Sequence, residues 1–153
     1  MTGEQVVTGS DGSWFEDGAD RGRIVVRSVA TEGAYSVLEW VVAPLVEGIK
    51  VANLGYDAHF HGAFEETFLV RSGALEFLIA DRCVTLCAGD FVRVPKAVRH
   101  GYRNTTGGPV NLIVTFVPGG FEQLFEKYRT DGEPCTGPGF VEEAVARFES
   151  AFE

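Results

Sequence analysis

Short runs of β-branched and aromatic residues, separated by turn residues, constrain the fold of this chain more than any other feature. From residue 67 to residue 117 they recur roughly every 8–12 positions, with Gly, Asp, Pro or Ser between them. The strands predicted here are Thr67–Val70, Ala74–Ala80, Arg82–Ala88, Phe91–Val94, Arg99–Arg103 and Val110–Val117. Because the connections are too short for crossover helices, neighbouring strands must be antiparallel. The pattern predicts an all-β sandwich or barrel.

The pattern extends toward the N-terminus. Arg23–Ala30 and Ala34–Val42 predict two strands in a hairpin-like arrangement, and Ile49–Leu54 predicts another short strand. Residues 1–20 are polar and rich in Gly and Asp, so we expect a mostly irregular arm that docks through Trp14 and Phe15. The expected organisation is an arm over residues 1–22, a β-barrel over 23–118 and C-terminal helices over 119–153.

The apolar period becomes helical after Pro118. The first predicted helix has one apolar face, formed by Phe121, Leu124, Phe125 and Tyr128. A Gly/Pro-rich loop then leads to a second helix, whose apolar stripe is Val141, Ala144, Val145, Phe148 and Phe152. We expect both stripes to pack against the outside of the barrel, and binding to a partner is the alternative.

Charge and composition narrow the range of partners. A length of 153 residues fits one domain with a sizeable core. The net charge of −9 argues against binding to nucleic acid or to an anionic membrane surface. No apolar run approaches the roughly 20 residues that span a bilayer. The first residues lack the basic and apolar regions of a secretory signal, so we expect a cytoplasmic protein.

The cysteines do not form a disulfide framework. Cys83 and Cys87 fall in one predicted strand, which places them about 13 Å apart at ~3.3 Å per residue. A disulfide requires Cα atoms within about 7 Å. We therefore expect reduced, partly buried thiols.

The chain has only three histidines, and they fall in two stretches. His59 and His61 are two residues apart in an extended-looking run, so both imidazoles leave the same face, and Glu66 follows after Gly62. His100 lies in the second stretch. If the two stretches are neighbours, three imidazoles and one carboxylate converge on one point. This donor set suits one divalent transition metal, among Fe, Ni, Mn, Co, Cu and Zn.

The alternation of side chains along a strand predicts which glutamate is the metal ligand and which residues line the site. Glu66 shares a face with Phe68 and Val70, so Glu66 is expected to point inward and Glu65 outward. The same alternation predicts an apolar, aromatic cavity, with Leu112, Val114, Phe116 and Trp40 as further lining residues. Tyr102 shares the face of His100 and could donate a hydrogen bond to a bound oxyanion. The alternative for Tyr102 is a core tyrosine with a satisfied hydroxyl.

These residues occur in two motifs that resemble the cupin signatures. The first motif is His-x-His, four residues, Glu, six residues and Gly, matched by His59, His61, Glu66 and Gly73. The second is Gly, five residues, Pro-x-Gly, two residues, His, three residues and Asn, matched by Gly89, Pro95, His100 and Asn104. Ala97 replaces the middle glycine of the second motif, and Asn53 replaces the leading glycine of the first. Both departures concern turns and no ligand.

The resemblance implies an antiparallel jelly-roll β-barrel, followed here by two C-terminal helices. It also implies that His59, His61, Glu66 and His100 ligate one divalent metal. The segment PGGFEQLFEKY is similar to small single-domain cupins of the quercetin-dioxygenase-like kind. We therefore expect an oxygenase acting on an enolic, phenolic or other aromatic or hydrophobic small molecule, with Glu66 and Tyr102 as catalytic candidates. The alternatives are a metal-dependent isomerase, cyclase or dehydratase, and a non-catalytic binding protein.

Short strands in an open barrel leave sheet edges unpaired, and natural proteins cover such edges. We therefore expect a homodimer, in which Arg23–Ala30 is the segment best placed to add to a neighbour's sheet. The alternative is that the arm and the C-terminal helices cover the edges within one chain.

Overall fold

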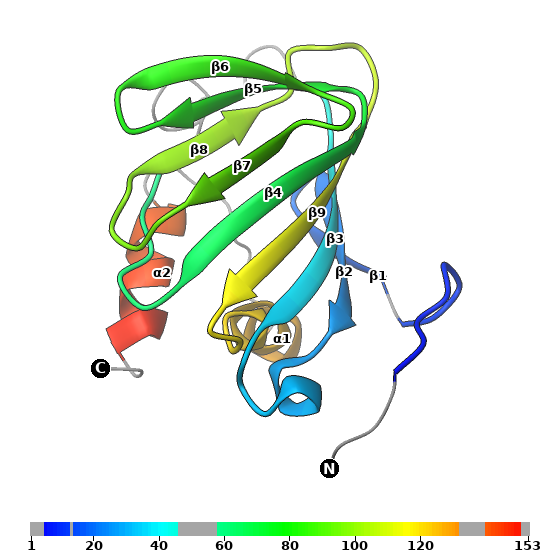
Figure 1. The fold of residues 1–153 in the computed structure, drawn as a ribbon, viewed down its shortest axis with the longest axis vertical. Helices are drawn as coiled ribbons and strands as arrows, with labels where there is room; N and C mark the ends of the chain where they lie inside the picture. Colours follow the sequence, from blue (N-terminus) through cyan, green and yellow to red (C-terminus); the bar gives the residue numbers. More distant parts are fainter. Residues whose placement is uncertain (1–4, 13, 46–57, 132–139, 151–153) are drawn as a thin grey trace.

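Two antiparallel β-sheets form the body of the protein in the computed structural model (Figure 1), which describes residues 5–12, 14–45, 58–131 and 140–150. A six-stranded sheet has the order β1-β2-β3-β9-β4-β7, and a three-stranded sheet has the order β6-β5-β8. The strands are β1 (Trp14–Asp17), β2 (Asp20–Val26), β3 (Ser36–Val42), β4 (Glu65–Ser72), β5 (Ala74–Ile79), β6 (Arg82–Cys87), β7 (Phe91–Val94), β8 (His100–Arg103) and β9 (Val110–Val117). All strand pairs are antiparallel, which confirms the predicted all-β architecture.

The strands β4 to β9 match the six predicted between residues 67 and 117. Two of them, Phe91–Val94 and Val110–Val117, have the predicted bounds. The predicted strand Ile49–Leu54 lies outside the described residues. No helix among the described residues is long and apolar enough to cross a membrane.

The N-terminal segment departs from the prediction of an irregular arm. From Trp14 onward it forms the β1–β2 hairpin, which continues the six-stranded sheet beside β3. The signal was missed because β1 is an edge strand of only four residues, two of them acidic. Phe15 is buried and its ring lies 5.7 Å from that of Trp40, so the predicted docking through Phe15 is confirmed. Trp14, by contrast, remains 38% exposed.

The strand predicted over Arg23–Ala30 also ends early. β2 stops at Val26, and Ser28–Thr31 forms a 3₁₀-helix. Within β2, a Cβ on Gly22 would approach the Trp40 ring to 2.5 Å. Glycine at this position therefore allows the close packing of β2 on the Trp40 ring.

The core lies between the two sheets and follows the two-residue period of the strands. In β4, Glu66, Phe68 and Val70 are buried, whereas their neighbours point outward. β9, the neighbouring strand of the same sheet, contributes a second inward-facing row, in which Val114 pairs with Phe68. The core also includes Leu38, Phe64, Leu75, Phe77, Leu112 and Phe116. Burial of each large apolar side chain contributes roughly 1.5–3 kcal/mol, so the core holds the sheets together and encloses Glu66.

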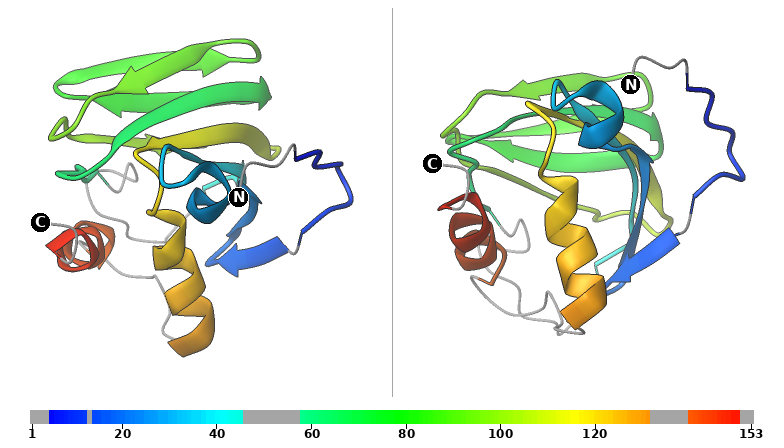
Figure 2. Two further views of the ribbon diagram at one scale, coloured as in Figure 1. Left: turned by 60° about the horizontal axis from the view of Figure 1, so that its bottom comes forward. Right: turned by 90° about the horizontal axis from the view of Figure 1, so that it is seen from below.

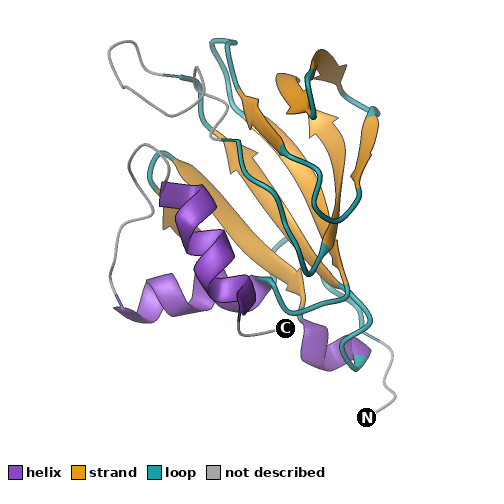
Figure 3. Ribbon diagram, turned by 90° about the vertical axis from the view of Figure 1, so that its left-hand side faces the viewer, coloured by secondary structure: helices purple, strands orange, loops and turns teal. Residues whose placement is uncertain are grey.

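Two helices follow β9, as predicted. They are α1 (Glu122–Asp131) and α2 (Phe140–Glu149), and Figures 2 and 3 show both at one end of the molecule. Phe121, just before α1, is buried with its ring 4.5 Å from that of Phe116, and Phe148 of α2 contacts Phe121. The helices therefore pack on the sheets, but they insert side chains at the end of the core and do not only cover its outer surface.

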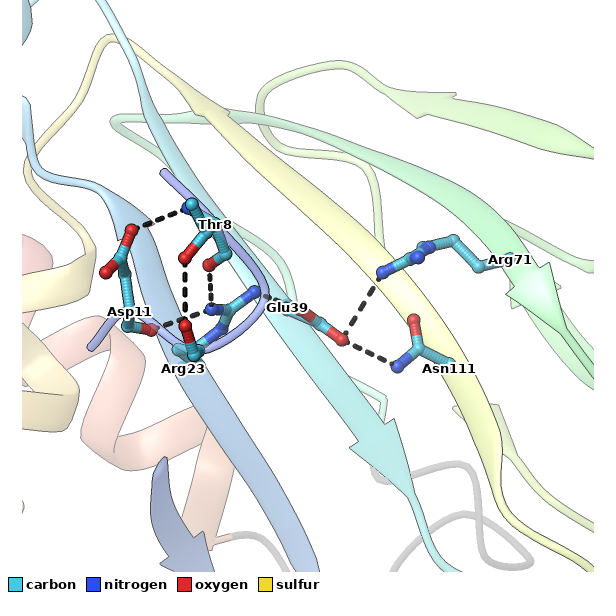
Figure 4. Close-up of polar contacts among 7 residues, drawn as sticks. Thr8, Asp11, Arg23, Glu39, Arg71 and Asn111 are labelled. Atoms are coloured by element: carbon cyan, nitrogen blue, oxygen red, sulfur yellow. Dashed lines mark hydrogen bonds and ion pairs between the residues drawn. The ribbon is translucent and has the colours of Figure 1, made fainter. Parts of the chain in front are cut away.

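Charged residues cluster on the six-stranded sheet (Figure 4). Arg23 forms a buried ion pair with Glu39 at 2.6 Å, and it donates to the carbonyls of Thr8 and Asp11. Burial alone would raise the pKa of Glu39, but hydrogen bonds from Asn111 and Arg23 hold the pKa below its ordinary value. The network fastens the segment before β1 to the sheet.

Cys83 and Cys87 are free thiols, as predicted, although both are exposed and not partly buried. They lie on β6, an edge strand of the three-stranded sheet. Cys135 lies outside the described residues.

Candidate metal centre

A backbone bridge joins the two histidine-containing stretches. The amide of His59 donates to the carbonyl of His100 at 2.9 Å, and the amide of His100 donates to the carbonyl of His59 at 2.8 Å. The amide of Ala97 donates to the carbonyl of His61 at 2.7 Å. The prediction that the two stretches are neighbours is therefore confirmed.

Four side chains converge beside this bridge. One ligand atom each from His59, His61, Glu66 and His100 lies within 4.8 Å of all the others. His61, Glu66 and His100 are buried, whereas His59 is half-buried. The sequence therefore predicted the convergence correctly, and the cluster could hold one metal ion.

Glu66 connects two of the histidines. Its Oε2 atom lies 3.0 Å from Nε2 of His61 and 2.8 Å from Nε2 of His100. Glu65 points to the other side of β4, where its carboxylate accepts two hydrogen bonds from Arg93 at 2.5 and 2.7 Å. The predicted orientation of the two glutamates is confirmed.

The Nδ1 partners of two histidines fix which ring nitrogen faces the cluster. Nδ1 of His100 lies 2.9 Å from the carbonyl of Val98, and Nδ1 of His61 lies 3.0 Å from Oε1 of Glu149. Both partners are acceptors, so each ring donates from Nδ1, and Nε2 is the nitrogen that faces Glu66 and could bind an ion.

The Nε2 atom of His61 tests whether these residues fit a metal. This nitrogen is buried and lies 3.0 Å from Oε2 of Glu66, the same oxygen that lies 2.8 Å from Nε2 of His100. Buried polar atoms require partners, and coordination of one ion would satisfy all three atoms at once. Imidazole and carboxylate donors are suited to a divalent transition metal. The donor set and its orientation therefore fit such an ion.

The buried carboxylates set the protonation of His61. Burial by itself lowers the pKa of His61, but the charges of Glu66 and Glu149 and their hydrogen bonds outweigh burial and raise this pKa to about 9. Burial would raise the pKa of Glu66, yet His61 and His100 hold it well below its usual range. A proton on His61 therefore occupies the position that a metal would take.

Aromatic rings surround the cluster. The His61 ring lies 4.6 Å from Phe121 and 5.6 Å from Phe116, and the His100 ring lies 5.9 Å from Phe68. The lining residues predicted from β4 and β9 do face inward and are buried. Trp40 is also buried, but its ring contacts in the described part of the chain are with Phe15 and Phe125. The surroundings are thus apolar and aromatic, while an open cavity stays a prediction.

Tyr102 lies beside the cluster. It is half-buried on β8, two residues after His100, and its ring lies 5.8 Å from Phe68 and 6.3 Å from Phe77. A catalytic role for Tyr102 stays a prediction.

Sequence reasoning missed Glu149. This residue ends α2, is 6% exposed, and contacts His61 from 88 positions away in the chain. One signal was present, because Glu149 follows Val145 by four residues and therefore lies on the apolar stripe of the helix. An acidic residue on a buried stripe requires a partner.

Two antiparallel sheets with three histidines and a glutamate between them define a small β-barrel protein with a candidate metal site. Comparison with known families identifies the barrel. The family described as "Cupin domain" matches residues 50–116. The chain is a cupin domain protein.

The relatives differ in chemistry. Quercetin 2,3-dioxygenase of Bacillus subtilis (strain 168) is 28% identical over 145 residues, which cover 94% of this chain but only 40% of that enzyme. KdgF from Halomonas sp. has a TM-score of 0.66 at 15% identity and covers 79% of this chain and 99% of its own. A predicted oxalate decarboxylase from Thermotoga maritima gives 0.63 at 16% identity, covering 74% and 99%. A nucleoside dehydratase of Streptomyces gives 0.59 at 19% identity, covering 79% and 88%. At these identities the solved structures show the fold alone.

Proposed function

We propose that this protein is a metal-dependent oxygenase acting on a small enolic, phenolic or other aromatic substrate. The observation that carries the proposal is the largely buried cluster of three imidazoles and one carboxylate, in which Nε2 of His61 and Nε2 of His100 both face Oε2 of Glu66. The chemistry that the metal would supply is binding of a substrate oxygen and activation of O2.

The choice of an oxygenase among metal-dependent reactions is supported by one relative. The quercetin 2,3-dioxygenase is similar over 94% of this chain, although the chain spans less than half of that enzyme's length. The apolar, aromatic surroundings of His61, which include Phe116 and Phe121, favour a planar or hydrophobic substrate.

In this proposal, Glu66 has two roles. As a carboxylate it would ligate the metal together with the three histidines, and a carboxylate oxygen of Glu66 that does not ligate the metal would accept the proton of the substrate hydroxyl. The lowered pKa of Glu66 keeps it ionised at neutral pH, which both roles require. Tyr102 is proposed to donate a hydrogen bond to the resulting substrate oxyanion.

Oxygen uptake tests the proposal. Protein loaded separately with Fe, Mn, Co, Ni, Cu or Zn is mixed with flavonols, simple phenols and 1,3-diketones in an oxygen electrode, with matched anaerobic incubations. We expect O2 consumption that follows substrate loss, with a redox-active metal. Conversion that proceeds without O2 and with Zn would instead support an isomerase, cyclase or dehydratase. Binding without turnover would support a non-catalytic binding protein.

The two adjacent glutamates provide a matched pair of variants. Glu66→Gln should lower metal affinity by more than about 100-fold and abolish O2 uptake, because Glu66 lies inside the cluster. Glu65→Gln should leave both within about threefold, since an exposed ion pair contributes little. Metal titration and O2 uptake are measured on both variants. Equal losses from the two would contradict the assigned ligand.

A further inference from the structure

The last residue of α2 contacts both His61 and its neighbour. Oε1 of Glu149 lies 3.0 Å from Nδ1 of His61, and Oε2 accepts a hydrogen bond from the amide of Gly62 at 2.8 Å. The two oxygens of the Glu149 carboxylate thus contact two consecutive residues. Glu149 is 6% exposed and His61 is 2% exposed, so water does not compete for these contacts.

Helix stability does not explain this glutamate. The C-terminal end of a helix carries partial negative charge, so a carboxylate there is unfavourable by roughly 0.3–1 kcal/mol. Burial of a carboxylate adds a further desolvation penalty. Glu122 provides the contrast, because it stands at the start of α1, where the helix dipole favours an acid, and it accepts from the amides of Ser28 and Gly120. Glu122 satisfies backbone amides at the start of its helix, whereas Glu149 is explained by its contacts with His61 and Gly62.

The contact with Glu149 determines how His61 can act as a ligand. A carboxylate only accepts hydrogen bonds, so His61 donates from Nδ1 to Glu149 and Nε2 is the nitrogen left to bind a metal. Nε2 is the buried nitrogen that lies 3.0 Å from Glu66. His100 is oriented in the same way, but by the neutral carbonyl of Val98. A charged partner on Nδ1 makes His61 the more strongly oriented and more basic of these two ligands.

We propose that Glu149 is a positioning residue of the metal centre, which the C-terminal helix delivers to hold His61 with Nε2 toward the metal. The inference rests on the proposed metal site, and it does not depend on whether the reaction is an oxygenation. It gives α2 a function in the site beyond packing on the barrel.

Metal titration of full-length protein tests the role. In Glu149→Gln, one amide cannot accept from both His61 and Gly62, so the affinity for Mn²⁺ or Co²⁺ should fall by about 10–100-fold. Glu122→Gln is the matched control. Like Glu149→Gln, it removes the charge of a buried helical glutamate, but Glu122 accepts from two backbone amides and not from a histidine. We expect its affinity to stay within about threefold. Both variants are compared by urea unfolding without metal, so that a loss of stability is separated from a loss of affinity.

A second measurement needs no variant and no metal. With ¹⁵N-labelled histidine, NMR of the metal-free wild-type protein above pH 9 identifies which nitrogen of His61 carries the proton, because its pKa of about 9 leaves the ring neutral only in that range. We expect Nδ1–H in the wild type and an increased share of Nε2–H in Glu149→Gln. A neutral wild-type ring protonated on Nε2 would overturn the inference, as would an unchanged metal affinity in a folded Glu149→Gln protein. Wild-type protein that binds none of the tested metals would contradict the metal site, while the NMR result would still decide whether Glu149 orients His61.

Discussion

At the scale of single residues, Ala97 has a backbone conformation that favours glycine. Its φ angle is 64°, in the left-handed region, and its amide holds the carbonyl of His61. The cupin motif resembled by this sequence has glycine at this position. An L-residue in the left-handed conformation is strained by roughly 1–2 kcal/mol, because its Cβ crowds the following carbonyl. The substitution of the motif glycine by alanine therefore costs stability next to a candidate ligand.

Ala97→Gly should therefore stabilise the protein. Relief of the strain is partly offset by the greater freedom of glycine in the unfolded chain, so we expect a gain of about 0.5–1 kcal/mol in the free energy of unfolding. Ala146→Gly on the exposed face of α2 is the control and should lose about 1 kcal/mol. Urea unfolding measures both. A loss from Ala97→Gly comparable to that of the control would show that this strain is absent.

At the scale of secondary-structure elements, the sequence predicted those strands whose position depends on neighbouring residues in the chain. β7 and β9 were predicted with their observed bounds, because alternating apolar residues between turn residues leave little freedom for strand position. β1 was missed, since a short edge strand is stabilised by pairing with β2 and by the burial of Phe15, and neither appears in a local pattern. For the site, alternation predicted the inward face of Glu66, and the two motifs predicted the four converging side chains. Glu149 was missed because its contact joins residues 88 positions apart.

The start of α1 is attached to the site through Phe121. Its ring lies 4.6 Å from His61, 4.5 Å from Phe116 and 5.6 Å from Phe64. Phe121→Ala should lower the free energy of unfolding by about 3–5 kcal/mol, because it leaves a cavity between α1 and the sheet. It should also weaken metal binding, since His61 loses one wall of its pocket.

Phe91→Ala provides the comparison for Phe121→Ala. Phe91 is 59% exposed on the edge strand β7, so its removal should change stability by less than about 0.5 kcal/mol. Urea unfolding and metal titration are measured on both proteins. An equally small effect of the two substitutions would mean that Phe121 does not fasten α1 to the site.

At the scale of the whole molecule, the sheets end at β1, β7, β6 and β8 among the strands that the structure describes, and at β8 only the bridge from His59 continues the pairing. The route to a dimer through Arg23–Ala30 stays a prediction, because β3 pairs with this segment as far as Val26 but β1 pairs with it only at Arg23. A homodimer remains our proposal on the ground that edge strands are usually covered. Sedimentation equilibrium at micromolar concentration should give the mass of two chains. The mass of one chain would refute the dimer.

The free energy of unfolding should also depend on the competition between a proton and a metal for His61. In the metal-free protein the pKa of His61 is about 9, above the ordinary value of 6.5. This raised pKa stabilises the metal-free fold fully below pH 6.5, and the contribution is lost as the pH rises through 9. A metal must displace the same proton, so metal affinity should increase by about tenfold per pH unit between pH 6.5 and 9.

The stabilisation by metal should therefore increase with pH while the metal-free protein becomes less stable. At a fixed, saturating concentration of free Mn²⁺, the gain in unfolding free energy should rise by about 1.4 kcal/mol per pH unit. Urea unfolding with and without Mn²⁺, at pH 6.5, 7.5 and 8.5 and without O2, measures this gain. A gain independent of pH across this range would mean that no proton leaves His61 when the metal binds, and would remove His61 from the set of ligands.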